Sequence, residues 1–339
     1  MKKIKWCIIG AGGIADRRAI PALLEDSENE IVAVMDKNPV IAKQVTEKYG
    51  FLNYYSDEEE MLKAVKCDAV YIGTPVFCHH SQALLALSYG ANVFMEKPIA
   101  MNEKEGLEII KAFKSAGKQL TIGYMMGYHN LHVKAKKLIL SKKLGDINLV
   151  KMQLSCWYPE IEGAWRQSKA LGGGGCIMDL AVHCMELFTA VTGDEIEDVK
   201  AFYTTKTFSY EVEDSAVITF KSKSGILGHI DVNFNIPDNC APSRIEIYGT
   251  SGSIIAEGTL GQEEIGRLKF IYSPQGKYDA AQSRSVAKPK IYYGNGGNIY
   301  TKQFKAFNKC LKNHPDYTNV YRALNIQKLC DKIYKENCY

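Results

Sequence analysis

Residues 5–15 read KWCIIGAGGIA, and this stretch decides the fold. An apolar run that suits a buried parallel strand ends in a glycine turn, and a helical pattern follows. Gly10 allows a tight turn, Gly12 lets the backbone approach a bound group, and Ala15 is small enough for close packing between helix and strand. Such a turn presents backbone amides at a helix N-terminus, where phosphate groups bind.

A second strand and an acid complete this pattern. Residues 31–35 are an apolar run rich in β-branched side chains, and Asp36 closes it about 20 residues after the turn. A carboxylate there accepts hydrogen bonds from the ribose hydroxyls of a dinucleotide. We therefore predict an NAD site formed by Gly10, Gly12, Gly13, Ile14, Ala15 and Asp36. Asp36 would repel a 2′-phosphate, but Lys37 could pair with one, so NADP stays an alternative.

Strands and helices alternate up to residue 123, and then the pattern changes. The alternation predicts a parallel, doubly wound α/β sheet. From Ile147 onward strands dominate, and several alternate apolar and polar residues, which is typical of an antiparallel sheet with one covered face. We therefore predict a Rossmann domain over residues 1–123 and an α+β domain with a large, mostly antiparallel open sheet over residues 124–339. The polar segment 275–298 is expected to be a long loop.

Composition argues against several classes of protein. The net charge of +4 is too small for a nucleic-acid-binding protein, and no basic run with interleaved aromatic residues occurs. No apolar stretch approaches the roughly 18 residues of a membrane span, and the apolar run near the N-terminus is too short for a signal peptide. The ten cysteines show no CxxC spacing, so we expect reduced thiols in a cytoplasmic protein without a disulfide framework.

A carboxylate and an ammonium follow the apolar run at residues 93–95. Glu96-Lys97-Pro98 ends this expected strand, as Thr74-Pro75 ends the one before it. Ligands of open α/β sheets bind at the C-terminal ends of the strands, and the glycine turn lies on the same edge. We interpret Lys97 as a catalytic or substrate-polarising cation and Glu96 as a cofactor contact.

A second informative stretch begins with four glycines, residues 172–175, and continues as an apolar helix to Phe188. Asp179 and His183 lie four residues apart and share one helix face, which Glu186 extends. A polar line on an otherwise apolar helix indicates function. The spacing matches no zinc motif and a fourth ligand is not evident, so we predict no metal site.

Together these motifs resemble the Gfo/Idh/MocA oxidoreductase family, the relatives of glucose–fructose oxidoreductase and inositol dehydrogenase. The resemblance spans nearly the whole chain and rests on the glycine turn, Thr74-Pro75 with His79, Glu96-Lys97-Pro98, Trp165-Arg166, and the glycine run leading to Asp179, His183 and Glu186. It implies NAD(H)- or NADP(H)-dependent chemistry on sugars or polyols, and a homodimer or homotetramer formed through the C-terminal sheet. The chain departs from the family at Val76, where Asn is common, and at Gly127, where many members have Arg.

The resemblance also implies roles for single residues. Lys97, in a cis peptide bond with Pro98, would contact both substrate and nicotinamide ribose, and Glu96 would contact the ribose. His183 would be the general acid and base, and Asp179 would orient it or hold a substrate hydroxyl. The remaining candidate cofactor contacts are Lys37, Thr74, Pro75 and His79, and the remaining candidate substrate contacts are Tyr128, His129, Trp165 and Arg166.

These roles predict reversible hydride transfer between nicotinamide and a secondary hydroxyl of a sugar, polyol or glycoside, in which His183 takes the hydroxyl proton. The same residues would serve a redox-neutral cleavage of a glycoside through a 3-keto sugar with retained NAD. A third interpretation is a regulator that binds NAD and a sugar without turnover. The presence of Lys97, Asp179 and His183 together favours an enzyme.

Overall fold

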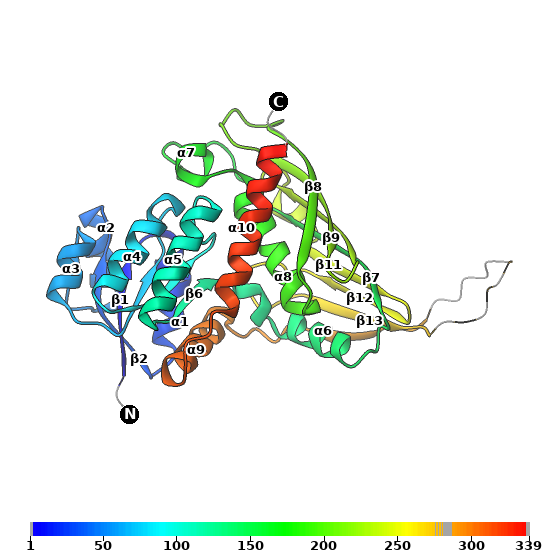
Figure 1. Ribbon diagram of the computed structural model, residues 1–339, viewed down its shortest axis with the longest axis horizontal. Helices are drawn as coiled ribbons and strands as arrows, with labels where there is room; N and C mark the ends of the chain where they lie inside the picture. Colours follow the sequence, from blue (N-terminus) through cyan, green and yellow to red (C-terminus); the bar gives the residue numbers. More distant parts are fainter. Residues whose placement is uncertain (1–2, 275, 277, 279, 281–286, 337–339) are drawn as a thin grey trace. The chain divides into compact units, whose positions relative to one another are not determined.

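The computed structural model describes residues 3–274, 276, 278, 280 and 287–336, which form two compact units (Figure 1). The first unit holds the residues up to Tyr124 together with Ser168–Gly173 and Tyr300–Asp331. The second holds Met125–Gln167, Gly174–Ile299 and the residues from Lys332 on. The expected division into residues 1–123 and 124–339 therefore differs from the observed one in two later segments, which pack with the first unit.

The first unit is built on a six-stranded parallel sheet in the order β3-β2-β1-β4-β5-β6. Its strands are β1 (Ile4–Ile9), β2 (Asn29–Met35), β3 (Tyr54–Tyr55), β4 (Ala69–Ile72), β5 (Asn92–Glu96) and β6 (Leu120–Gly123). This is the strand order of the dinucleotide-binding doubly wound fold, so the predicted parallel sheet is confirmed. The two-residue strand β3 was not expected from the sequence.

Five helices connect these strands. They are α1 (Ile20–Leu24), which follows a π-helical turn at Ala15–Ala19, α2 (Pro39–Tyr49), α3 (Glu58–Ala64), α4 (His79–Ser88) and α5 (Glu103–Ala116). Asn38, Asp57 and Asn102 precede three of them, and each side chain accepts a hydrogen bond from a backbone N–H of the first turn. Because parallel strands all end at one edge, these connections bring the glycine turn and the loops after β4 and β5 together.

Two C-terminal helices, α9 (Ile299–Lys312) and α10 (Thr318–Glu336), end the described chain. The ring of Phe304 lies 4.6 Å from that of Phe94, and the ring of Phe307 lies 5.2 Å from that of Trp6. At the start of α10, Asn319 hydrogen-bonds both the N–H and the carbonyl of Ile122, at 2.6 and 3.1 Å. The apolar face of α9 therefore covers the first sheet, which explains why this late segment belongs to the first unit.

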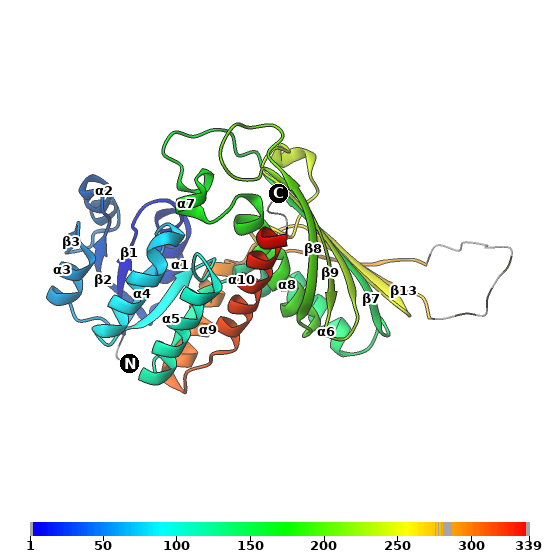
Figure 2. The ribbon, with the colours of Figure 1, turned by 45° about the horizontal axis from the view of Figure 1, so that its top comes forward.

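The second unit contains an eight-stranded sheet in the order β14-β13-β12-β11-β7-β10-β9-β8 (Figure 2). Its strands are β7 (Ile147–Ser155), β8 (Ile196–Thr204), β9 (Ser215–Ser222), β10 (Leu227–Asn233), β11 (Arg244–Gly249), β12 (Gly252–Glu257), β13 (Arg267–Tyr272) and β14 (Lys290–Tyr293). Neighbouring strands are antiparallel except β7 and β10, which run parallel, so the predicted mostly antiparallel sheet is confirmed.

The segment 275–298 is not a loop throughout. Residues 290–293 form β14, which pairs antiparallel with β13 at the edge of the large sheet. This strand has four residues and polar neighbours, so its sequence pattern is too short to distinguish it from a loop. Residues 275, 277, 279 and 281–286 of the expected loop lie outside the described residues.

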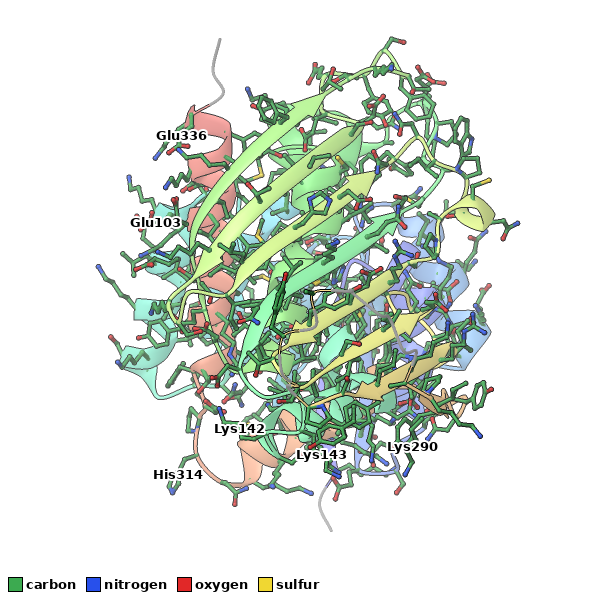
Figure 3. The ribbon with its side chains drawn as sticks, turned by 90° about the vertical axis from the view of Figure 1, so that its right-hand side faces the viewer. Glu103, Lys142, Lys143, Lys290, His314 and Glu336 are labelled. Atoms are coloured by element: carbon green, nitrogen blue, oxygen red, sulfur yellow. The ribbon has the colours of Figure 1, made fainter. Side chains whose placement is uncertain are left out.

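Two helices, α6 (Asn130–Leu140) and α8 (Val182–Thr192), pack together, and α8 packs against β7 of the large sheet. A π-helical turn, Ile177–Ala181, leads into α8. The opposite face of the sheet is turned to the viewer in Figure 3. The alternation of buried and exposed residues along β8 and β10 places the exposed side chains of Phe202 and Leu227 on this face.

One helical stretch, Lys169–Thr192, includes the short helix α7 (Lys169–Gly172) and is long and apolar enough to cross a membrane. The sequence-based expectation that no such stretch exists was therefore wrong. However, 89% of its most apolar window is buried inside the protein, as in the core helix of a globular domain.

Candidate active site

The glycine turn leaves β1 at the C-terminal edge of the first sheet. Gly10 has a φ of +83°, and a Cβ there would lie 2.8 Å from Cγ2 of Thr74 and 3.0 Å from the carbonyl carbon of Gly73. Only glycine fits both the backbone conformation and this close approach of the β4 end. The turn and the Thr74-Pro75 loop are thus brought together, as the sequence predicted.

Asp36 lies at the end of β2, and its carboxylate also closes the glycine turn. One carboxylate oxygen accepts hydrogen bonds from the N–H groups of Ala11 at 3.0 Å and Gly12 at 3.2 Å. The other accepts from the N–H of Asn38 at 2.9 Å. A negative charge fixed at this position favours ribose hydroxyls over a 2′-phosphate. Lys37 is exposed next to it.

His79 links the loops that follow β4 and β5. It is buried, its Nδ1 lies 2.8 Å from the carbonyl oxygen of Pro98, and its Nε2 lies 3.1 Å from that of Thr74. The Thr74 hydroxyl donates in turn to Gln82 at 2.6 Å. His79 is therefore a brace between two backbone loops, and its expected contact with a cofactor stays a prediction.

Glu96 ends β5 and Lys97 follows it, both half-buried, and the Lys97–Pro98 peptide bond is cis. The hydroxyl of Tyr71 donates to the Glu96 carboxylate at 2.8 Å. Burial and then the charge of Glu96 raise the pKa of Tyr71 well above its usual value, so the tyrosine remains a hydrogen-bond donor. Tyr71, which the sequence did not single out, thus fixes the carboxylate next to Lys97.

The helix that carries Asp179 and His183 begins irregularly. Its first turn, Ile177–Ala181, is π-helical, and such turns are frequent at functional sites. His183 is 7% exposed and Glu186 is 5% exposed, so both lie inside the second unit. The predicted polar line therefore lies on a buried element.

Asp179 forms an ion pair with Arg166, with 3.1 Å between Nε and the carboxylate oxygen. The guanidinium carbon lies 4.1 Å from the centroid of the Trp165 ring. Burial lowers the pKa of Arg166, and the charge of Asp179 raises it. The pKa lies above its ordinary value as a result. Tyr158, which sequence reasoning missed, also raises the pKa of Arg166. The structure thus brings together three predicted substrate contacts, Trp165, Arg166 and Asp179.

Both ring nitrogens of His129 lie against backbone groups of the protein. It is fully buried, Nδ1 accepts from the N–H of Leu131 at 3.1 Å, and Nε2 lies 2.9 Å from the carbonyl oxygen of Ile265. The ring caps α6 and anchors the loop before β13, and its expected substrate contact stays a prediction. Tyr128 is half-buried beside it.

Gly127, the position where related sequences often carry Arg, packs on α8. A Cβ there would lie 3.3 Å from Cβ of Ala190 and 3.8 Å from a carboxylate oxygen of Glu186. Glu186 therefore occupies the neighbourhood that an arginine at this position would enter.

The two units offer different chemistry. The first presents a glycine turn, a fixed carboxylate and Lys97 at one sheet edge, which suits a dinucleotide. The second presents an imidazole on the same helix as a carboxylate that is paired with a guanidinium, which suits proton transfer to and from a hydroxyl. Within the described ranges, no three His, Cys, Asp or Glu side chains gather in an arrangement that could hold a metal ion.

Comparisons with known proteins cover most of the chain. The model of the oxidoreductase family with an NAD-binding Rossmann fold matches residues 4–124, and that of the GFO/IDH/MocA C-terminal domain matches residues 132–255. The 1,5-anhydro-D-fructose reductase of Ensifer adhaerens is 24% identical over 311 residues, 91% of this chain and 89% of the relative. The scyllo-inositol 2-dehydrogenase (NADP+) of Bacillus subtilis is 27% identical over 301 residues, 84% of this chain and 88% of the relative.

Solved structures show the same fold. The aldose–aldose oxidoreductase from Caulobacter crescentus complexed with glycerol superimposes with a TM-score of 0.86 at 22% identity, covering 98% of this chain and 97% of the other.

Proposed function

Because the chain belongs to the Gfo/Idh/MocA family of NAD-binding oxidoreductases, we propose that it oxidises a secondary hydroxyl of a sugar, polyol or glycoside, and catalyses the reverse reduction. The observation that carries this proposal is that one chain combines a glycine turn closed by Asp36 with a buried helix bearing Asp179 and His183. The names of two similar proteins, an inositol dehydrogenase and an anhydrofructose reductase, support the substrate class.

The first unit would hold the cofactor. The amides of the glycine turn suit a pyrophosphate, and Asp36 suits the adenosine ribose. When bound, nicotinamide supplies the acceptor for the hydride. Two backbone amides fix the Asp36 carboxylate in place, which supports a preference for NAD. The exposed Lys37 keeps NADP as the second candidate, and the similar scyllo-inositol 2-dehydrogenase is named for NADP+.

The second unit would move the proton. His183 takes the proton of the substrate hydroxyl as the carbon–hydrogen bond breaks, a task that imidazole performs well near neutral pH. Asp179, held by Arg166, offers a carboxylate oxygen to a substrate hydroxyl or to the imidazole. Lys97 stabilises the negative charge that develops on the hydroxyl oxygen.

The open face of the large sheet supports assembly into a homo-oligomer. Phe202, Leu227 and Tyr293 lie on this face and are 86%, 57% and 68% exposed. Between them, Arg244 pairs with Glu246 at 2.9 Å and His229 with Asp231 at 3.4 Å, so the face carries both signs of charge. A mixed apolar and charged surface of this kind suits contact with a second copy of itself. A cytoplasmic location is supported by the cysteines, since all nine in the described residues are free thiols.

A substrate panel tests the proposed activity. Sugars, inositols and glycosides are offered with NAD and with NADP side by side, and reduction of the cofactor is followed by absorbance. We expect at least one neutral polyhydroxylated compound to reduce the cofactor. Cleavage of a glycoside without net reduction would favour the redox-neutral alternative, and binding without turnover across the panel would favour a regulator.

A further inference from the structure

We propose that Glu213, together with Tyr334, is a positioning residue that sets where the helix bearing Asp179 and His183 begins. The inference rests on the proposed function, because that function gives these two side chains their role in proton transfer. Glu213 lies in the connection between β8 and β9, and Tyr334 lies in the last turns of α10.

The Glu213 carboxylate gathers three donors on one oxygen. Oε1 accepts hydrogen bonds from the N–H of Gly175 at 2.9 Å, the N–H of Ile177 at 3.0 Å and the hydroxyl of Tyr334 at 2.8 Å. The backbone oxygen of Glu213 also accepts from the N–H of Cys176 at 3.0 Å. The first N–H groups of a helix have no partner within the helix, and here one residue binds three in succession.

The hydrogen bonds between Glu213 and the helix start are buried, so water cannot replace them. Glu213 is 5% exposed, and burial raises the pKa of its carboxyl, opposed by the hydrogen bonds from Ile177, Tyr334 and Gly175. Donors that lose their acceptor in such a place remain without water to replace it, which is costly. The start of the helix is therefore held at one point and cannot slide without leaving several buried N–H groups unbonded.

The glycine run is the counterpart of this anchor. A Cβ at Gly175 would overlap the backbone oxygen of Glu213, and one at Gly174 would overlap the hydroxyl of Tyr334. A side chain at either position would therefore prevent this close approach at the helix start. The structure shows that Glu213 and Tyr334 are what the backbone approaches.

The anchored start determines where the functional side chains point. The N–H of Asp179 donates to the carbonyl of Gly175 at 3.0 Å, so Asp179 lies one turn beyond the anchor. A shift of the start by one residue would rotate Asp179 and His183 by roughly 100° about the helix axis. Even a displacement of about 1 Å can cost about 10²-fold in rate.

Tyr334 is itself held by β8. Its ring packs edge-on against that of Tyr203, with centroids 5.7 Å apart, and Glu336 pairs with Lys200 at 2.9 Å. Lys332 also pairs with Asp198. The end of α10 therefore supports the carboxylate that anchors the helix.

Two conservative variants separate position from charge. Glu213→Gln keeps an oxygen in the same place and loses the charge, whereas Glu213→Asp keeps the charge and withdraws the oxygens by one methylene. We expect E213Q to retain at least about a third of the wild-type kcat and E213D to lose more than about tenfold. In E213D the solvent deuterium isotope effect on kcat should also rise, because proton transfer to a displaced His183 becomes slower. The KM for NAD should change less than about twofold in both, because the dinucleotide residues belong to the first unit.

Tyr334→Phe is the matched variant on the other side of the anchor. It removes one donor and leaves the acceptor, so we expect a loss in kcat of about threefold, between the effects of E213Q and E213D. Equal kcat in E213Q and E213D, or a lower kcat in E213Q than in E213D, would overturn the proposal.

Hydrogen–deuterium exchange gives a readout that needs no activity. The amides of Gly175 and Ile177 should exchange faster in E213D than in the wild type and stay protected in E213Q. Unchanged protection in E213D would show that Glu213 does not hold the helix start. If the wild-type protein turns over no substrate, the proposed function fails, while the exchange result still decides whether Glu213 fixes this helix.

Discussion

Asp36 combines two tasks in one side chain, closure of the glycine turn and selection of the cofactor. Asp36→Asn keeps an oxygen for the N–H groups of Ala11 and Gly12 but removes the charge. We expect kcat/KM with NAD to fall about tenfold, which corresponds to about 1.4 kcal/mol. The ratio of kcat/KM with NAD to kcat/KM with NADP should fall as well. Steady-state kinetics with both cofactors measure this. Asp16→Asn, which changes a half-buried carboxylate paired with Lys48, is the control. An unchanged ratio of kcat/KM with NADP to kcat/KM with NAD in D36N would contradict the assignment.

His183 is the residue on which the proposed proton transfer depends. His183→Ala should lower kcat by about 10²–10⁴-fold, because general acid–base help is lost, while the dissociation constant of the cofactor stays the same. Stopped-flow turnover and fluorescence titration with NADH measure the two quantities. His80→Ala, which removes a half-buried partner of Glu108, is the control, and its kcat should remain close to that of the wild type. Turnover like that of the wild type in H183A would remove His183 from the mechanism.

The sequence predicts the position of single residues in the fold where the motif is local. The spacing from the glycine turn to Asp36 is a property of one strand–helix–strand unit, and the four-residue spacing of Asp179 and His183 is a property of one helix. The roles of Glu213 and Tyr334 could not be predicted, because both residues are far in sequence from the helix start that they hold. Glu213 follows Gly175 by 38 residues, and Tyr334 follows it by 159. The contact of His129 with the carbonyl of Ile265, 136 residues away, could not be predicted for the same reason, and its expected role at the substrate stays a prediction.

At the scale of elements, α6 depends on a neutral histidine. Burial, and then the neighbouring His129, lower the pKa of His132 from 6.5 to about 3. Its Nδ1 lies 2.7 Å from the carbonyl oxygen of Met126, and its Nε2 lies 3.0 Å from the hydroxyl of Thr259. Between pH values of about 3 and 6.5, His132 is therefore neutral in the folded protein and protonated in the unfolded chain. The stabilisation is complete above the unfolded pKa and is lost as the pH falls toward the folded pKa.

His132→Asn tests this linkage. In the wild type, protonation of His132 in the unfolded chain should lower the free energy of unfolding by about 1.4 kcal/mol for each unit by which the pH falls between about 6 and 4. Asn keeps a donor for Met126 but does not titrate, so the slope of stability against pH should be smaller by about one proton. Urea unfolding at a series of pH values measures it. Identical slopes in the two proteins would show that His132 is not the responsible group.

Elements with a strong local signal were predicted with near-correct bounds. The strands expected at residues 31–35 and 93–95 are β2 and β5. The strands β3 and β14 were missed because two and four residues are too few for a periodic pattern. The π-helical turn before α8 was not foreseen, because five residues are too few for a periodic pattern to distinguish it from an α-helical turn.

At the scale of the whole molecule, the sequence predicts both sheets and the family but not the place of the late helices. An amphipathic pattern shows that α9 has one apolar face, but it does not show which sheet that face covers. The contact of Phe304 and Phe307 with Trp6 and Phe94 is visible only in the folded chain. The homo-oligomer proposed to form through the open face of the large sheet is also a prediction about the whole molecule.

Phe202→Asp tests assembly through the open sheet face. Phe202 is 86% exposed, so a charge there should leave the fold of one chain intact and repel a second copy. We expect the molar mass from light scattering to fall to that of a smaller species at equal concentration. Leu52→Asp, at a 93% exposed apolar residue of the first unit, is the matched control. A wild-type monomer, or an unchanged mass in F202D, would contradict an interface on this face.

The central claim is that a hydride leaves the carbinol carbon of a polyhydroxylated substrate and is released on the reduced cofactor. The most direct measurement uses the best substrate from the panel with deuterium on that carbon, and analyses the released cofactor and product by mass spectrometry. The account predicts one deuterium in each released NADH or NADPH, one ketone for each reduced cofactor, and a primary isotope effect on hydride transfer. Product formation without a labelled, released cofactor would contradict it.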